Sequence, residues 1–304
     1  MIGSPEGDDG ELFGRISDIV VGPHGEVYVA DLGYQRVQKY DSTGQHVGVV
    51  GGQGEGPGLY YDPCAVALDS KANVYVASRG RISIFDGHGV FVQELRTNLS
   101  GFVRKIRVNT DNVVFVSCFD LMSQQIVHRF PLTDGTRGGS FCDSYAVDSD
   151  EDTREEMMIA GGSIDIRNDG TILYTQMTPY EIRLFSPEGV LLSAIYRAND
   201  FMTPPRVEYL PGGGVTLHAY PMSVSIIVLG DGRFVNAVIR PVSAEESETI
   251  LDVYEGAGVL IGTTRLAGAL GLKCRDERGR LYASERGDFP KVVKYKVHFE
   301  GGRK

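Results

Sequence analysis

Short apolar strands alternate with polar turns along almost the whole chain. The first pattern is an apolar strand, a turn rich in Gly, Asn and Asp, and a second strand rich in Val, Tyr and Phe. β-Branched and aromatic residues on both sides of a short turn predict a β-hairpin. Copies of this pattern lie at residues 16–31, 64–78, 105–118, 163–176, 225–239 and 271–286.

A second pattern follows the first in most units. An aromatic residue is followed four positions later by a glycine and then by another apolar strand, and the copies begin at Tyr40, Phe85, Phe185 and Tyr254. We expect the glycine to supply positive φ in a hairpin turn. A longer version over residues 130–141 serves the third unit.

Because the two patterns alternate, each unit is predicted to be a four-stranded antiparallel meander. The units recur at intervals of about 40–60 residues, which is typical of a β-propeller. The fold class is therefore all-β: a six-bladed β-propeller with a last blade that shows three clear strands. A solenoid is the structural alternative, although its repeats are usually shorter and end in polar caps. The predicted innermost strands are 16–21, 64–69, 104–108, 163–167, 224–229 and 271–275.

One propeller domain is expected to occupy residues 1–304. The predicted blades are 14–50, 60–95, 101–141, 160–196, 224–266 and 268–300. Residues 197–223 form a hairpin-like insert, residues 142–160 include an acidic loop, and residues 241–251 are expected to form one or two helical turns. Blade six is expected to stay three-stranded or to be completed by residues 298–303 or by a short N-terminal stub.

The units resemble NHL repeats, and the chain is similar to bacterial six-bladed propeller proteins. The resemblance is carried by EVYVADLGYQRVQKYDSTGQHVGVVGGQGEGPG at 26–58 and NVYVASRGRISIFDGHGVFVQEL at 73–95. It covers residues 11–95 well and residues 160–196 and 268–297 less well. The resemblance implies the fold, but it says little about function because propellers carry many unrelated roles.

The overall charge restricts the class of partner. The formal net charge is −10 and the pI is near 5.1, which does not favour a nucleic-acid partner. Membrane insertion is not expected because the chain lacks a stretch of about 18 apolar residues. The N-terminal sequence has no signal-peptide pattern, so the compartment stays open: exported if the gene product begins further upstream, cytoplasmic otherwise. The four cysteines are expected to be largely buried free thiols.

Ligands of propellers usually meet the channel mouth, which is formed by the loops between second and third strands and by the links between blades. The residues predicted to bind a ligand there are Asp31, Tyr34, Arg79, Asp120, Tyr180, Glu285 and Arg286. Mixed charge with aromatic rings suits a small polar or peptide ligand. Asp31 and Arg36 have a second interpretation, in which the carboxylate satisfies loop amides and fixes the turn.

Candidate chemistry is sparse. No cofactor is predicted, but calcium remains open because Asp148, Asp150 and Asp152 could gather oxygen ligands, although Thr153 and Ile159 depart from the EF-hand pattern. No histidine falls on a predicted innermost strand. Asp18, Asp165 and Asn109 lie near the ends of those strands without a recognisable metal pattern. The glycine-rich run 51–58 is interpreted as a link between blades because no helix follows it.

The favoured function is a non-enzymatic binding propeller that presents a loop face to a protein, peptide or glycan. The alternative is a metal-assisted lyase or hydrolase with its site at the channel mouth. A third hypothesis is assembly, in which the incomplete last blade accepts a strand from a neighbouring chain.

Overall fold

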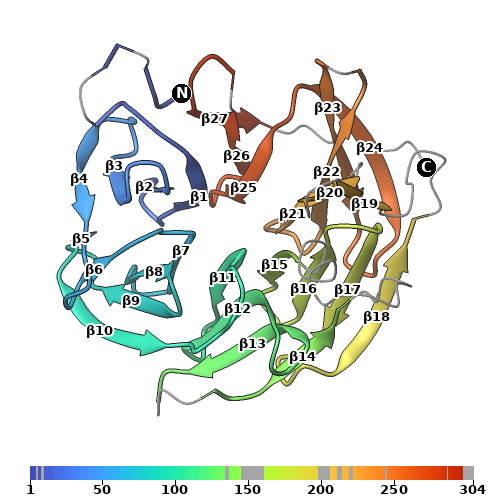
Figure 1. Cartoon of the computed structure of the whole chain (residues 1–304), viewed down its shortest axis with the longest axis horizontal. Helices are drawn as coiled ribbons and strands as arrows, with labels where there is room; N and C mark the ends of the chain where they lie inside the picture. The colour runs from blue at the N-terminus through green and yellow to red at the C-terminus, as the bar shows by residue number, and fades with distance from the viewer. Residues whose placement is uncertain are drawn as a thin grey trace.

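The computed structural model describes residues 1–4, 6–7, 10–133, 137–144, 161–197, 206–210, 214–218, 222–243, 245–285 and 287–296. For residues 206–210 and 214–218 only the backbone is described. The described elements are all β-strands, and Figure 1 shows their sheets arranged as blades around a central axis.

The first three blades are complete four-stranded meanders. Blade 1 contains β1 (Ile16–Val21), β2 (Val27–Asp31), β3 (Arg36–Tyr40) and β4 (His46–Val50). Blade 2 contains β7 (Ala65–Leu68), β8 (Val74–Ser78), β9 (Arg81–Phe85) and β10 (Phe91–Arg96). Blade 3 contains β11 (Lys105–Val108), β12 (Val113–Asp120), β13 (Gln125–Pro131) and β14 (Ser140–Asp143). A short parallel pair, β5 (Gly52–Gln53) and β6 (Leu59–Tyr60), lies in the link between blades 1 and 2.

The remaining blades follow the same plan except for the last. Blade 4 contains β15 (Gly162–Ile166), β16 (Ile172–Gln176), β17 (Glu181–Phe185) and β18 (Leu191–Tyr196). Blade 5 contains β21 (Met222–Val228), β22 (Phe234–Pro241), β23 (Ser247–Tyr254) and β24 (Leu260–Ala267). Blade 6 contains β25 (Gly271–Arg275), β26 (Arg280–Glu285) and β27 (Lys291–Lys296). An isolated hairpin, β19 (Arg206–Leu210) with β20 (Gly214–His218), lies in the predicted insert.

The first strand of each blade forms the inner ring. β1 contacts β7 and β25, β11 contacts β7 and β15, and β21 contacts β15 and β25. The predicted innermost strands are therefore confirmed to within two residues at their ends. The predicted helical turns at 241–251 are wrong, because residues 247–251 belong to β23. Ile250 and Leu251 pack into two different apolar clusters, one on each side of the blade. This burial outweighs the helical propensity of the glutamates that precede them.

Turn chemistry explains why the hairpins recur. The glycines of the second pattern all have positive φ: 92° at Gly44, 85° at Gly89, 92° at Gly189 and 88° at Gly258. In the first hairpin of blade 2, the Asp69 carboxylate accepts the amides of Lys71 and Asn73 at 2.8 and 2.9 Å. Such side-chain-to-backbone bonds fix the turn without help from the rest of the fold.

The apolar side chains are buried between neighbouring blades. Each of six clusters joins two adjacent sheets, and the last joins blade 6 to blade 1 through Tyr282, Ile19 and Phe13. At this seam Ile2 pairs with Val292 on β27, with N–O distances of 3.0 and 2.8 Å. Blade 6 has three strands, as one of the three alternatives predicted, and Ile2 adds a single bridge to the last of them; residues 298–303 lie outside the described residues.

Candidate functional site

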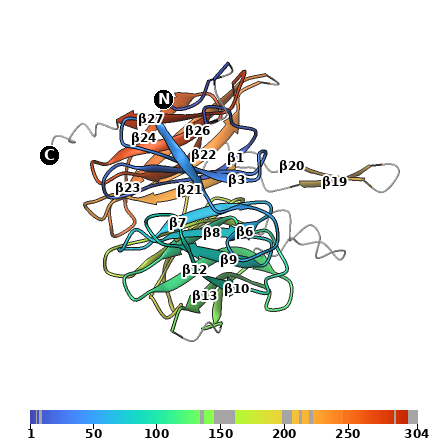
Figure 2. The same ribbon diagram turned by 90° about the vertical axis from the view of Figure 1, so that its left-hand side faces the viewer.

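The loops between second and third strands share one face of the propeller with the links between blades. This follows from the meander, because the second and fourth strands of a blade run in the same direction and end on the same side. We call this side the loop face. The β19–β20 hairpin lies in the link between blades 4 and 5, and Figure 2 shows it projecting away from the ring of blades.

Asp31 organises the loop of blade 1 rather than opening toward solvent. Its buried carboxylate accepts amides from Gly14 at 3.0 Å, Arg15 at 2.8 Å, Gly33 at 2.9 Å and Tyr34 at 3.2 Å. The structural interpretation of this residue is confirmed. The carboxylate therefore holds the loop backbone in place.

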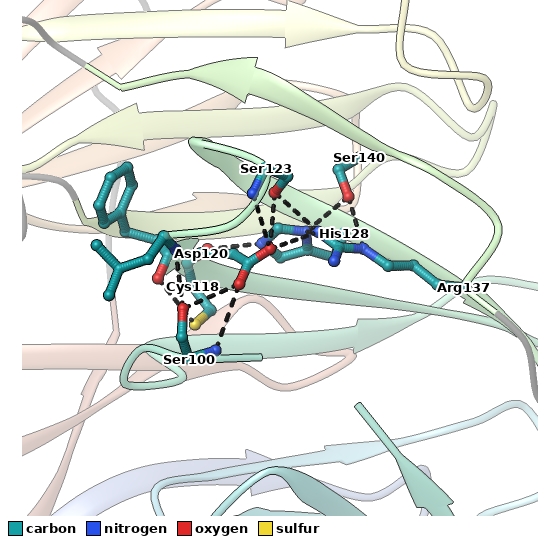
Figure 3. Close-up of polar contacts among 9 residues, drawn as sticks. Ser100, Cys118, Asp120, Ser123, His128, Arg137 and Ser140 are labelled. Atoms are coloured by element: carbon teal, nitrogen blue, oxygen red, sulfur yellow. Dashed lines mark hydrogen bonds and ion pairs between the residues drawn. The ribbon is translucent and has the colours of Figure 1, made fainter. Parts of the chain in front are cut away.

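Asp120 has a similar position at the end of β12 in blade 3 (Figure 3). Its carboxylate accepts hydrogen bonds from Ser100 Oγ at 2.9 Å, Ser123 Oγ at 2.8 Å and Arg137 at 3.0 Å. Burial raises the pKa of the Asp120 carboxyl, but these hydrogen bonds outweigh it and hold the pKa well below its ordinary value. The carboxylate is therefore ionised and fully engaged by the loop.

His128 completes this network and was not singled out by the sequence. Its Nε2 lies 2.7 Å from the Cys118 carbonyl oxygen, and its Nδ1 lies 2.8 Å from Ser140 Oγ and 2.7 Å from Arg137. Burial lowers the pKa of His128 to about 4, so the ring is neutral at pH 7. Nε2–H donates to the carbonyl and Nδ1 accepts. Because Arg137 Nε also donates to Ser140 Oγ at 2.8 Å, the serine is held within the network.

Tyr180 is buried at the end of the loop of blade 4. Its hydroxyl lies 3.0 Å from an Asp252 carboxylate oxygen and 2.6 Å from the Tyr254 hydroxyl. Burial, followed by the charges of its neighbours, raises the pKa of Tyr180 above its ordinary value. The hydroxyl therefore joins blades 4 and 5 inside the molecule.

Three of the other predicted residues, Tyr34, Arg79 and Glu285, have side chains that are at least partly exposed. Tyr34 is 51% exposed, and the Arg36 guanidinium lies 5.2 Å from its ring centroid. The Arg79 side chain is 75% exposed and forms an ion pair with Asp62. Glu285 forms an ion pair with Lys291 at 3.4 Å. Arg286 lies outside the described residues.

A hollow of about 450 Å³ lies on the loop face at blade 2. Its size is within the usual range for small-ligand sites. Arg79 is the one residue of the predicted set that lines it. The lining residues are Glu55, Tyr61, Ser78, Arg79, Gly80, Arg81, Glu94, Arg96 and Asn98. They come from the link between blades 1 and 2, from the β8–β9 turn, and from the end of β10, so the hollow depends on how the link packs over the blade.

Charged side chains on the inner strands pair with one another across the ring. The Lys105 ammonium on β11 forms a buried ion pair with Asp18 on β1, and it donates to the Lys273 carbonyl at 2.9 Å. Burial lowers the pKa of Lys105, an effect that the Asp18 charge opposes. The Asp18 carboxylate also accepts the amides of Ile19 and Val66 at 2.9 and 3.1 Å.

A second ion pair lies beside the first. Arg107 Nε on β11 lies 2.6 Å from the Asp165 carboxylate on β15, and that carboxylate accepts the Val228 amide at 2.8 Å. Asn109 instead shapes a turn, where its side chain accepts the Asp111 amide at 3.1 Å. The carboxylates near the axis are thus held by cations and by backbone amides.

No group of three or more His, Cys, Asp or Glu side chains is arranged to hold a metal ion within the described ranges. The acidic stretch with Asp148, Asp150 and Asp152 lies outside them. The four cysteines are free thiols, and burial raises the pKa of each to about 12. Within the described part of the chain, there is no helix long and apolar enough to cross a membrane.

These features define a six-bladed β-propeller with ion pairs between its inner strands and a hollow on its loop face. No protein-family model matches the chain, and no curated protein matches its sequence. Solved structures share its fold. A member of the DUF4221 family from Bacteroides vulgatus is 12% identical, covers 95% of each chain and has a TM-score of 0.64.

Two further structures show the range of proteins built on this fold. The calcium-binding protein regucalcin from Agrobacterium tumefaciens is 14% identical, with 96% of this chain and 94% of that chain covered and a TM-score of 0.56. A streptogramin B lyase is 11% identical, with 91% and 77% covered and a TM-score of 0.52. At these identities the likeness concerns the fold alone.

Proposed function

We propose that the chain is a non-enzymatic binding propeller that presents its loop face to a protein, peptide or glycan, with the hollow at blade 2 as the point of attachment. The observation that carries the proposal is this hollow of about 450 Å³ with a mixed-charge lining. It lies on the face where the loops between second and third strands meet the links. A rigid scaffold that presents loops is a common arrangement for recognition.

The predicted site residues take two roles in this proposal. Tyr34, Arg79 and Glu285 have exposed groups on the loop face and are proposed to contact the ligand, and Arg286 stays a prediction of the same kind. Asp31, Asp120 and Tyr180 use their polar groups inside the molecule, so we propose that they act by holding the loops in shape. We also propose, from YVAD at 28–31 and YVAS at 75–78, that the blades are NHL-like repeats.

The alternative remains a metal-assisted lyase or hydrolase at the channel mouth. Asp18 and Asp165 lie on inner strands, and each carboxylate is engaged by a cation and by at least one backbone amide. That arrangement favours the binding module. Calcium binding by Asp148, Asp150 and Asp152 stays a prediction.

A displayed library of random peptides, panned on the immobilised protein, tests the proposal. The double variant Arg79→Glu with Arg96→Glu reverses two exposed charges at the hollow, and Arg278→Glu makes the same kind of change in an exposed turn on the opposite face. The proposal would be supported by clones that bind the wild type and Arg278→Glu but do not bind the double variant. A glycan array with the same three proteins covers sugar ligands. If neither library yields binders that distinguish the double variant, the hollow is not the ligand site.

A further inference from the structure

In blades 1 and 6 an acid lies opposite a base where the second strand meets the third, whereas blade 3 pairs Asp120 with Gln125 and blade 4 pairs Gln176 with Glu181. Asp31 pairs with Arg36 in the register of blade 1, and Glu285 pairs with Lys291 in blade 6. In blade 2 the same register position pairs Ser78 with Arg81. Blade 2 therefore keeps the base of the pair and lacks its acid.

The turn of blade 2 is also shorter than that of blade 1. Residues 32–35 connect β2 to β3, whereas residues 79–80 alone connect β8 to β9. A serine in place of an aspartate, together with this tight turn, removes side-chain and backbone atoms from the space above Arg81. The hollow occupies that space.

Ser78 is buried beneath the surface of the hollow. Ser78 is 2% exposed and belongs to the lining of the hollow. Its Oγ has no hydrogen-bond partner among the described residues. Buried hydroxyls in folded proteins are nearly always hydrogen-bonded. The hydroxyl is closed off from solvent, so a ligand in the hollow does not contact it directly, and Ser78 matters here for its position, where blade 1 has Asp31.

Two of the arginines at the hollow share a single carboxylate. Arg81 donates to Glu94 and to the carbonyls of Glu55 and Gly54, each at 3.2 Å. The same Glu94 carboxylate lies 3.6 Å from Arg96, so one acid serves two guanidinium groups. Three arginines and two glutamates line the hollow, and Arg79 pairs with Asp62 beside it, so the charges balance while Arg81 and Arg96 share one carboxylate.

We propose that the hollow at blade 2 binds a carboxylate group of an acidic peptide, which takes the place that the aspartate holds in blade 1. Guanidinium groups bind carboxylates through paired, directed hydrogen bonds. The single aromatic ring in the lining, that of Tyr61, offers little stacking surface to a sugar. This inference rests on the proposed function and names its ligand chemistry.

Ser78→Asp installs the missing acid within the chain and is the central test. The probes are a labelled peptide of alternating glycine and glutamate, the same peptide with glutamine, and an oligogalacturonate, all followed by fluorescence anisotropy. We expect the wild type to bind the glutamate peptide at least about tenfold more tightly than the glutamine peptide. Ser78→Asp should lose binding about tenfold or more while its melting temperature stays equal or rises, because Arg81 gains a partner.

Two variants serve as controls. Ser78→Ala removes a hydroxyl but adds no acid, so it should bind the glutamate peptide within about threefold of the wild type. Arg96→Gln changes an exposed side chain that the fold does not require, and it should weaken binding even if Ser78→Asp fails to fold.

Each contrary outcome would overturn one part of the proposal. Equal binding of the glutamate and glutamine peptides would refute carboxylate recognition while leaving loop-face binding intact. Tighter binding of oligogalacturonate than of the peptide would refute the assignment to a peptide. If the random library enriches binders at the hollow but the glutamate peptide does not bind, the carboxylate inference fails and the proposed function stands.

Discussion

Lys105 on β11 and Asp18 on β1 form an ion pair across the inner end of blade 2, although 87 positions separate them in sequence. Their side chains are 5% and 1% exposed. The pair joins blades 1 and 3 directly, and the Lys105 ammonium also reaches the Lys273 carbonyl of blade 6. Three blades therefore meet at one ammonium group.

Asp18→Asn is expected to lower the free energy of unfolding by about 3–5 kcal/mol, because Lys105 would be left as an uncompensated buried charge. Urea unfolding followed by circular dichroism measures the change. The double variant with Lys105→Met removes both charges and should recover most of the loss. Equal stability of Asp18→Asn and the wild type would show that the pair does not hold the inner ring together.

Stability should fall when pH is lowered from 7 toward 4, because the pKa of buried His128 lies at about 4 instead of its ordinary 6.5. The unfolded chain takes up the proton below pH 6.5, whereas the folded chain resists until about pH 4. The neutral His128 ring contributes roughly 3 kcal/mol to the free energy of unfolding. This contribution is complete above pH 6.5 and is lost as the pH falls from 6.5 to 4.

Urea midpoints measured between about pH 5 and 7 test this dependence, with His128→Gln as the comparison. The variant lacks the titrating ring, so its stability should change less over that range. If both proteins lose stability in parallel, another group is responsible for the slope.

Removal of residues 1–4 should destabilise the seam between blades 6 and 1. The change deletes two backbone hydrogen bonds of Ile2 with Val292 and the packing of the Ile2 side chain on the Phe13 cluster. We expect a loss of about 2 kcal/mol and, at high concentration, self-association through the freed edge of β27. Thermal unfolding and light scattering measure both effects. Removal of Met1 alone keeps the pair and should change neither.

Elemental analysis separates the binding module from the metal-assisted alternative. Protein purified without chelator is expected to contain calcium, magnesium and zinc well below one equivalent. One equivalent of any of them, lost together with turnover of a defined substrate after dialysis against chelator, would reverse the proposed function.

The fold could be predicted because its determinants are local. Strand alternation, the glycines at 44, 89, 189 and 258, and the spacing of the hairpins act within a few residues of one another. The site could not be predicted in the same way. The hollow depends on the link that carries Glu55 and Tyr61 packing over β10, and the His128 network gathers side chains from three separate segments between residues 100 and 140.

One signal for the hollow was nevertheless present in the sequence. The YVAD of blade 1 becomes YVAS in blade 2, and comparison of the two copies places Ser78 opposite Arg81. What the letters alone do not show is whether the missing acid is replaced by another side chain. Glu94 replaces it only in part, because it is shared with Arg96.

The seam between blades 6 and 1 is held by different contacts near the axis and at the outer edge. Near the axis, Lys273 Nζ donates to the Ser17 carbonyl at 2.8 Å. The Lys105 ammonium contacts both the Lys273 carbonyl of blade 6 and Asp18 of blade 1. At the rim, the Ile2–Val292 bridge is one residue pair long. On heating or under mechanical force, the outer edge of the seam should therefore separate first while the contacts near the axis stay formed. The ring can then open locally at its outer edge and close again without unfolding.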